Sequence, residues 1–264
     1  MTATGPEMGS LKDKVAIVTG ASTPKGIGNA IAQRFAHAGA SVFLVAEGTL
    51  EQLQAAQRHC QGFAGAGRIE YGLFDLSKPG AAEEMVAKAD ELFGRVDVLV
   101  NNAGIRAPYD YGDYTRDQFD RTVAVNLAAP FFAGQSVIPI MRRQGGGRII
   151  NIASQLGKVT FAKRALYGLT KAALIHLTKS MAYELGVHGI VVNSISPGPV
   201  KTQPILDRME ADPAEAERRL KNYVPLGRFG EPWEIADLAL YLATTPATFL
   251  QGEDICIDGG YTVH

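Results

Sequence analysis

The sequence is poor in cysteine, in excess charge and in metal-ligand patterns. Only two cysteines occur among 264 residues, Cys60 and Cys256, far apart and without metal-ligand spacing. Lys and Arg number 26 against 27 Asp and Glu, so no basic excess points to nucleic acid. The histidines show no metal spacing either, and no metal is expected. These absences favour a cytoplasmic protein with reduced thiols, whose partners are small molecules or copies of itself.

Membrane signals are also missing from the sequence. The opening residues, MTATGPEMGSLKDK, contain no apolar core, and the longest apolar runs have the length of strands. No membrane association is therefore expected. Residues 1–10 are small, polar and without periodicity, which predicts a flexible tail.

What the chain does contain is a repeated alternation of short apolar runs and longer segments of helical period. Continuous apolar strands are buried on both faces, and their alternation with helices predicts a Rossmann-like, doubly wound parallel sheet flanked by helices, in a single α/β domain over 1–264. The predicted strands are Val15–Val18, Ser41–Val45, Arg68–Phe74, Val96–Val100, Arg148–Ile152, Ile190–Ile195 and Asp254–Ile257.

Helices are predicted between these strands, with one irregular segment. Capping glycines and prolines bound the expected helices Ile27–Ala38, Pro79–Leu92 and Ala165–Leu185. A further helix, Thr115–Arg143, is expected to break or kink near Pro130 and Pro139. The charged segment Gln203–Tyr223 lacks the strand–helix pattern and is predicted to form a mobile helical lid over the substrate.

The stretch TGASTPKGIG, Thr19–Gly28, follows a predicted strand and opens a predicted helix. Glycines there let the backbone approach a pyrophosphate, and the helix N-terminus offers unpaired N–H groups to it. A glycine loop alone is a weak signal, because a tight turn without a ligand has the same sequence features.

The loop resembles the TGxxxGIG motif of the short-chain dehydrogenase/reductase (SDR) family, lengthened by two residues at Pro24-Lys25. The resemblance covers Leu11 to about Tyr261. It rests further on Asp75, Asn101-Asn102-Ala103-Gly104, Asn126, Ser154, Tyr167-x-x-x-Lys171, Pro197-Gly198 and Asp258-Gly259-Gly260. It implies an NAD(P)-dependent enzyme that acts on CH–OH groups.

Tyr167 and Lys171 stand four residues apart in a predicted helix and share one face. A nearby ammonium stabilises a phenolate and lowers the tyrosine pKa, which suits a general acid and base. Ser154 ends a strand at the ligand-binding edge of the sheet, where it serves either to polarise a carbonyl or as a local cap. By the resemblance Asn126 completes the catalytic set through a water relay; a buried Asn bonded to backbone is the alternative.

The resemblance also implies a coenzyme-binding set. Its members are Gly20, Ser22, Lys25, Gly26, Ile27, Gly28, Glu47, Asp75, Leu76, Asn102, Ala103, Gly104, Tyr167, Lys171, Pro197, Gly198, Val200 and Thr202. Glu47 follows the second strand, where a carboxylate disfavours a 2′-phosphate, whereas Lys25 favours one. NAD is the preferred coenzyme and NADP the alternative.

The substrate is less well defined by the sequence. Arg106, Gln155 and Arg164 flank the catalytic strand ends and are candidates for binding hydroxyls or an anionic group, with plain surface solvation as the alternative. A small polyol, sugar or hydroxy acid is the preferred substrate. A 3-oxoacyl carrier-protein thioester reduced with NADPH is the second possibility, and a silent nicotinamide-sensing module the third.

The family often assembles into tetramers, through the helices with Asn126 and Tyr167 and through the C-terminal strand region. Ala165–Leu185 is apolar on more than one face, which fits a homo-oligomer, expected to be a tetramer. Burial inside one subunit would give the same pattern.

Overall fold

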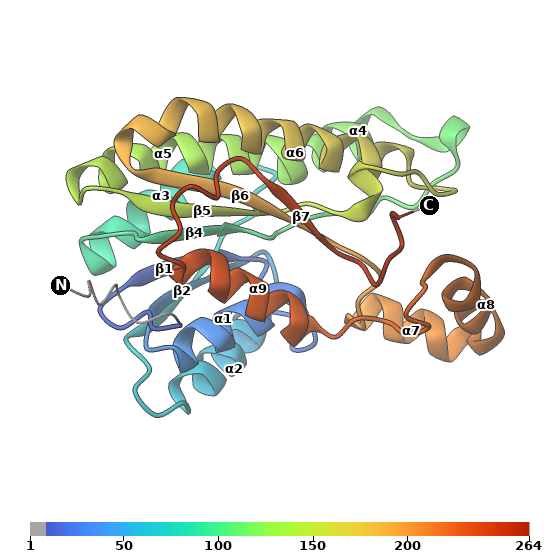
Figure 1. Cartoon of the computed structure of the whole chain (residues 1–264), viewed down its shortest axis with the longest axis horizontal. Helices are drawn as coiled ribbons and strands as arrows, with labels where there is room; N and C mark the ends of the chain where they lie inside the picture. The colour runs from blue at the N-terminus through green and yellow to red at the C-terminus, as the bar shows by residue number, and fades with distance from the viewer. Residues whose placement is uncertain (1–8, 264) are drawn as a thin grey trace.

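A computed structural model describes residues 9–263 and shows one parallel sheet between two helical layers (Figure 1). The strand order is β3-β2-β1-β4-β5-β6-β7. The strands are β1 (Val15–Thr19), β2 (Ser41–Ala46), β3 (Ile69–Leu73), β4 (Val98–Asn101), β5 (Gly147–Ile152), β6 (Ile190–Pro197) and β7 (Asp254–Ile257). The predicted fold is confirmed; the expected tail, residues 1–10, lies outside the described residues except for its last two.

Two helical layers cover the sheet. On one face lie α1 (Ile27–His37), α2 (Leu50–Gln61) and α9 (Pro232–Thr244). On the other lie α3 (Ala81–Phe93), α4 (Arg116–Val123), α5 (Ala129–Arg143) and α6 (Ala165–Leu185). Short 3₁₀ turns complete the connections at η1 (Tyr111–Asp113), η3 (Gln155–Gly157) and η4 (Gly186–His188).

The core consists of two apolar clusters, one on each face of the sheet. Neighbouring residues of a strand point to opposite faces. Accordingly, Val18 of β1 joins the cluster beneath α1 and α9, whereas Ile17 joins the cluster beneath α3 and α5. Both side chains are fully buried. Packing on both faces therefore explains why the strands are continuously apolar.

The helix over Arg116–Arg143 contains a π segment, η2 (Ala124–Ala128), rather than a break at each proline. Pro130 has no N–H to donate to the carbonyl of Asn126, four residues earlier. The π segment accommodates that missing donor, and Pro139 lies within α5. The predicted irregularity near Pro130 is confirmed in this form, whereas at Pro139 the helix is not broken.

The continuous helix Arg116–Arg143 also has the length and apolar composition of a membrane span. Its α5 part packs against α3, β4 and β5. Its apolar face is therefore used in the core of the domain.

The segment Gln203–Tyr223 forms two helices, α7 (Gln203–Ala211) and α8 (Pro213–Tyr223), which project beside the carboxyl ends of the strands (Figure 1). Asp212 caps α8 by accepting a hydrogen bond from the Glu215 N–H at 2.9 Å. Aromatic contacts join Tyr223, at the end of α8, to Phe161 and Tyr261, with ring centroids 5.7 and 5.8 Å apart. The α8 end of this segment is thus attached to the rest of the domain through aromatic contacts.

Candidate functional site

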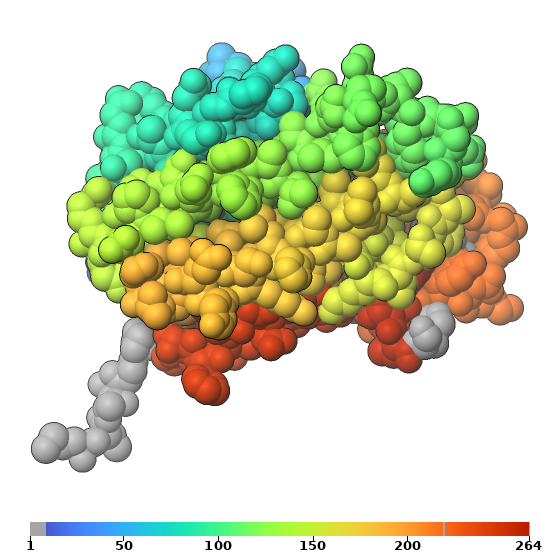
Figure 2. All heavy atoms as spheres, turned by 90° about the horizontal axis from the view of Figure 1, so that it is seen from above, coloured from blue at the N-terminus to red at the C-terminus, as the bar shows by residue number. Residues whose placement is uncertain are grey.

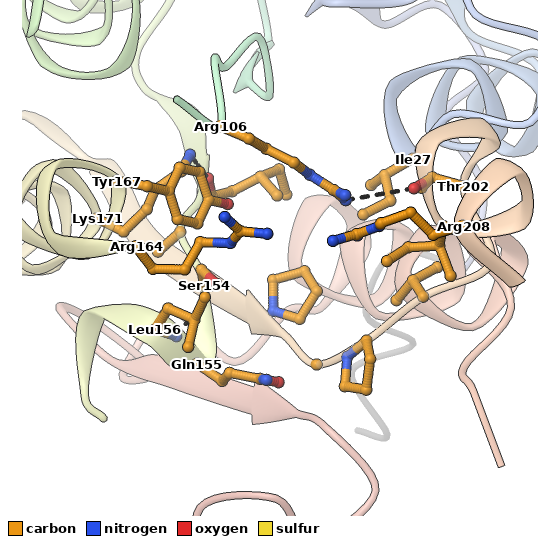
Figure 3. A pocket seen from close by; sticks show the side chains of 17 residues that line it. Ile27, Arg106, Ser154, Gln155, Leu156, Arg164, Tyr167, Lys171, Thr202 and Arg208 are labelled. Carbon is orange, nitrogen blue, oxygen red and sulfur yellow. Dashed lines mark hydrogen bonds between the residues drawn. The ribbon is translucent and has the colours of Figure 1, made fainter. Parts of the chain in front are cut away.

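Two cavities open at the carboxyl ends of the central strands. β1 and β4 are neighbours in the sheet although they are not consecutive in the chain, so the order of strands reverses between them. Ligands of doubly wound sheets bind at this point, beyond the carboxyl ends of the strands. An inner cavity of about 120 Å³ is lined by Ser154, Tyr167 and Lys171 of the predicted catalytic set (Figure 3). A second cavity, of about 440 Å³, lies between the glycine loop and the ends of β2 and β4.

Ser154 follows β5 and is almost fully buried. Its Oγ accepts a hydrogen bond from the Leu156 N–H at 3.2 Å, so it caps η3 while facing the inner cavity. The hydroxyl also hydrogen-bonds Tyr167. The cap and the catalytic placement are therefore compatible, because one hydroxyl both accepts and donates.

Tyr167 lies in the first turn of α6, and Lys171 follows one turn later. The Lys171 Nζ is 5.7 Å from the centre of the Tyr167 ring and donates a hydrogen bond to the Ile152 carbonyl at 2.7 Å. Burial lowers the pKa of Lys171 to about 8. The structure thus brings both side chains to one cavity wall.

The pKa of Tyr167 departs from the sequence-based expectation. Burial raises it, while the positive charges of Arg106 and Arg164 and the hydrogen bond with Ser154 oppose that rise. The expected lowering by Lys171 is not found, because this ammonium is directed to a main-chain carbonyl. The phenol is therefore held in its protonated form, in which it can donate a proton.

Asn126 is fully buried in the π segment. Its Oδ1 accepts from the Ile105 N–H at 2.7 Å, and its Nδ2 donates to the Ile105 carbonyl at 2.9 Å and to Thr170 Oγ1 at 3.0 Å. The side chain is thus occupied with fixing the loop after β4. Pro130 removes the N–H that the main-chain carbonyl of Asn126 would otherwise accept from in an α-helix.

The lengthened glycine loop absorbs its two extra residues in a turn. The Gly26 N–H donates to the Thr23 carbonyl at 2.8 Å, so Pro24-Lys25 form the tip. Gly20 has a left-handed φ of 68°, which favours glycine. Gly26 begins α1 without a side-chain cap, so the first N–H groups of this helix are available to an anion. These residues fit a dinucleotide pyrophosphate.

The second cavity contains six residues of the predicted coenzyme set. They are Gly20, Ser22, Glu47, Leu76, Ala103 and Gly104. Glu47 also forms an ion pair with Arg121 of α4, at 2.5 Å between Oε1 and the guanidinium. The sequence did not indicate Arg121, since nothing in the pattern of α4 pairs it with a residue 74 positions earlier.

Several predicted coenzyme residues support this cavity from outside its described lining. Asn102 Nδ2 donates to the Thr19 carbonyl at 2.8 Å and so joins β1 to β4. Asp75 accepts hydrogen bonds from the Ser77 N–H and hydroxyl. A Cβ on Gly28 would lie 2.5 Å from the Gly20 carbonyl oxygen. Lys25 is exposed and belongs to the lining of neither cavity.

The inner cavity is lined by eleven predicted residues and by six that were not predicted as site residues. The predicted ones are Ile27, Arg106, Ser154, Gln155, Arg164, Tyr167, Lys171, Pro197, Gly198, Val200 and Thr202. Arg208 and Ile205 of α7 also line it. Helical periodicity did not reveal them, because the orientation of α7 depends on tertiary contacts. Over residues 9–263 the structure has no cluster of three or more potential metal ligands.

Comparisons with known proteins agree with this geometry. Residues 20–262 match the family model described as enoyl-(acyl carrier protein) reductase. The chain is 36% identical over 258 residues to D-beta-hydroxybutyrate dehydrogenase of Rhizobium meliloti, covering 94% of this chain and 98% of the relative.

Two solved structures are similar over nearly their whole length. L-sorbose reductase from Gluconobacter frateurii, complexed with NADPH and L-sorbose, has a TM-score of 0.91 at 29% identity, covering 98% of this chain and 100% of that one. A 3-oxoacyl (acyl-carrier-protein) reductase from Agrobacterium tumefaciens with NADP bound has a TM-score of 0.90 at 31% identity, covering 96% of both.

Fold and site define an NAD(P)-dependent oxidoreductase that acts on CH–OH groups. The chain belongs to the short-chain dehydrogenase/reductase family.

Proposed function

We propose that this enzyme interconverts a secondary alcohol and a ketone, with a small polyol, sugar or hydroxy acid as substrate. The main observation that supports this proposal is that Ser154, Tyr167 and Lys171 line one small cavity, beside residues suited to hold a nicotinamide. Pro197, Gly198, Val200 and Thr202 would hold that ring.

The residues of the cavity perform distinct steps. The nicotinamide, when bound, supplies or accepts the hydride. Ser154 donates a hydrogen bond to the reacting oxygen and stabilises its developing negative charge. Tyr167 gives its proton to that oxygen in reduction and takes it back in oxidation. Arg106 and Arg164 favour the phenolate that remains, because their positive charge lowers the Tyr167 pKa.

Lys171 and Asn126 connect the phenol to solvent. The Lys171 ammonium, with a pKa of about 8, can exchange protons near neutral pH. Asn126 and Lys171 both lie beside Gly104, where a Cβ would be 3.5 Å from both Asn126 Oδ1 and Lys171 Nζ. The main-chain carbonyl of Asn126 is proposed to hold the water that carries the proton onward.

Gln155 supports a substrate with more than one hydroxyl. Its side chain is almost fully buried and lines the inner cavity. Its Oε1 makes no hydrogen bond within the described part of the chain. A buried acceptor without a donor costs about 1–3 kcal/mol. A second substrate hydroxyl would supply that donor.

NAD is proposed as the preferred coenzyme. Glu47 lines the adenosine-side cavity, whereas Lys25 does not. A 2′-phosphate there would meet a carboxylate, although Arg121 beside Glu47 reduces that repulsion. Two similar structures hold NADP or NADPH, which keeps NADP as the alternative.

A carrier-protein thioester reductase is the alternative, and one observation favours it. A wider outer cavity of about 780 Å³ is lined by Lys163, Arg106, Arg164 and Arg208, a basic entrance that suits an acidic carrier. The inner cavity is small, which favours the smaller substrate.

The active form is proposed to be a cytoplasmic homotetramer, with α7 and α8 as a substrate lid. Figure 2 views the outer surface of α4, α5 and α6. Large apolar side chains are exposed there, namely Phe131 and Phe132 of α5 and Leu169 and Tyr183 of α6. Light scattering after size-exclusion chromatography tests this assembly, because a tetramer has four times the 28.2 kDa mass of one subunit.

The proposed reaction is tested by following reduced nicotinamide while the protein meets polyols, sugars, hydroxy acids and acyl thioesters with each coenzyme. Turnover of a small hydroxylated compound with NAD, lost in Tyr167→Phe and kept when the exposed Tyr241 of α9 is replaced by Phe, supports the proposal. Exclusive turnover of thioesters with NADPH supports the alternative. Coenzyme binding without any turnover across the panel indicates a sensor.

A further inference from the structure

An ion pair joins two distant segments of the chain at the second cavity. Glu47, in the loop after β2, is the one charged residue among the described residues that line this cavity. The Arg121 guanidinium of α4 donates to Glu47 Oε1 at 2.5 Å. Val125, four residues after Arg121 in the same continuous helix, also lines the cavity. Because residues four apart share one side of a helix, Arg121 lies on the side that borders the coenzyme site.

The contact between Arg121 and Glu47 is one that a ligand can open. The two side chains are 52% and 51% exposed, and an ion pair so close to water contributes little to stability. The same guanidinium acts on Asp75: the Ser77 hydroxyl is the main group that lowers the pKa of Asp75, and the charge of Arg121 lowers it further. Arg121 thus brings positive charge to both carboxylates of the predicted coenzyme set.

Lys25, the other cation considered for this part of the coenzyme, lies elsewhere. It is exposed at the tip of the glycine loop and belongs to the lining of neither cavity. Arginine also matches a phosphate better than lysine does, since its planar fork donates two parallel N–H bonds to the phosphate oxygens. The geometry therefore favours Arg121 over Lys25 as the partner of an anion beside Glu47.

We propose that Arg121 determines coenzyme specificity by binding the 2′-phosphate of NADP, and that Glu47 competes with this phosphate for the same guanidinium. The inference rests on the proposed coenzyme site and assigns its discrimination to two residues. After the second strand of a dinucleotide-binding sheet, a carboxylate accepts from the ribose 2′-hydroxyl, whereas an arginine accommodates a 2′-phosphate. This chain has both groups there, bonded to each other. NAD leaves the pair intact, whereas NADP must separate it.

Two fragments of the coenzymes test Arg121 without nicotinamide or turnover. Adenosine 5′-monophosphate and adenosine 2′,5′-bisphosphate differ only in the 2′-phosphate. Titration calorimetry gives the ratio of their dissociation constants, bisphosphate over monophosphate. Arg121→Gln should raise this ratio about tenfold, because hydrogen bonds to a charged group are lost. Glu47→Gln should lower it by about the same factor, because the competing carboxylate is gone.

The double variant distinguishes a direct contact from screening of Glu47. If Arg121 only screened that carboxylate, its replacement would change nothing in protein that already carries Glu47→Gln. We expect instead that Arg121→Gln raises the ratio about 10- to 100-fold there, because the phosphate no longer competes for the guanidinium. Arg121→Lys should retain part of the preference. No effect of Arg121→Gln in combination with Glu47→Gln overturns the proposal.

Two single variants serve as controls. Arg116→Gln, exposed on the same helix α4, should leave the ratio unchanged. Lys25→Gln should also leave it unchanged, and a ratio that responds to Lys25 but not to Arg121 overturns the assignment.

Fluorescence titration with NADH and NADPH repeats the comparison on whole coenzymes. A changed ratio in the Arg121 variants supports the inference even if no alcohol or ketone turns over, an outcome that would reject only the proposed reaction. Equal ratios in wild type and all variants, with both coenzymes bound, overturn the inference and leave the proposed reaction standing.

Discussion

Replacement of Lys171 by Met is expected to stabilise the fold while abolishing activity. Lys171 is 3% exposed, and burial lowers its pKa from the ordinary 10.5 to about 8. That difference corresponds to about 3 kcal/mol of destabilisation wherever the folded protein must hold the ammonium charged. Met has a similar volume, but it leaves the buried Ile152 carbonyl without its donor, which costs about 1–3 kcal/mol. The net expectation at pH 7 is a gain of up to about 2 kcal/mol.

The stability difference between Lys171→Met and the wild type should depend on pH. Between pH 8 and 10.5 the unfolded chain holds more protons at this position than the folded protein, so wild-type stability rises with pH across that window. The advantage of Lys171→Met is therefore present at pH 7 and disappears near pH 10.5. Urea unfolding at both pH values measures it, with Lys179→Met, exposed on the same helix, as control. A variant less stable than wild type at pH 7 would refute the reasoning.

Two further substitutions test the frame around the site. Burial of Asp97 opposes its ionisation, but hydrogen bonds from Arg95 and the Val15 N–H, together with the charge of Lys14, outweigh burial and lower its pKa. Asp97→Asn should therefore lower the free energy of unfolding by about 2 kcal/mol near pH 7. This difference between wild type and variant should narrow below about pH 4, where the wild type loses the stabilisation, and unfolding measured across acid pH checks it. Gly28→Ala places a methyl group against the Gly20 carbonyl and the Asn102 side chain, so coenzyme affinity measured by fluorescence should fall about tenfold or more, and unchanged affinity would contradict the close packing seen here.

The sheet could be predicted because each strand is marked by residues that are neighbours in the sequence. Each buried strand is a short apolar run, and every predicted strand occurs within about two residues of its predicted ends. The meeting of Ser154, Tyr167 and Lys171 at one cavity was predictable for a similar reason, since Tyr167 and Lys171 share a helix face and Ser154 follows a strand.

What escaped prediction depends on contacts between distant segments. Arg208 reaches the cavity only because α7 packs beside the strand ends, and Arg121 meets Glu47 across 74 residues. The direction of the Tyr167 pKa was also missed, since burial and the charges of Arg106 and Arg164 cannot be read from a four-residue spacing. The π segment at Asn126 follows from Pro130, but its type required the structure.

The central claim is hydride transfer at a site where Tyr167 moves the proton. The direct measurement uses a substrate that turns over, deuterated at its carbinol carbon, and follows the label into the reduced nicotinamide by mass spectrometry. The structure predicts quantitative transfer of deuterium in the wild type, and a rate in Tyr167→Phe lower by about 10²- to 10⁴-fold. Undiminished transfer in that variant, or reduced nicotinamide that carries no deuterium, would contradict the assignment of this cavity as the active site.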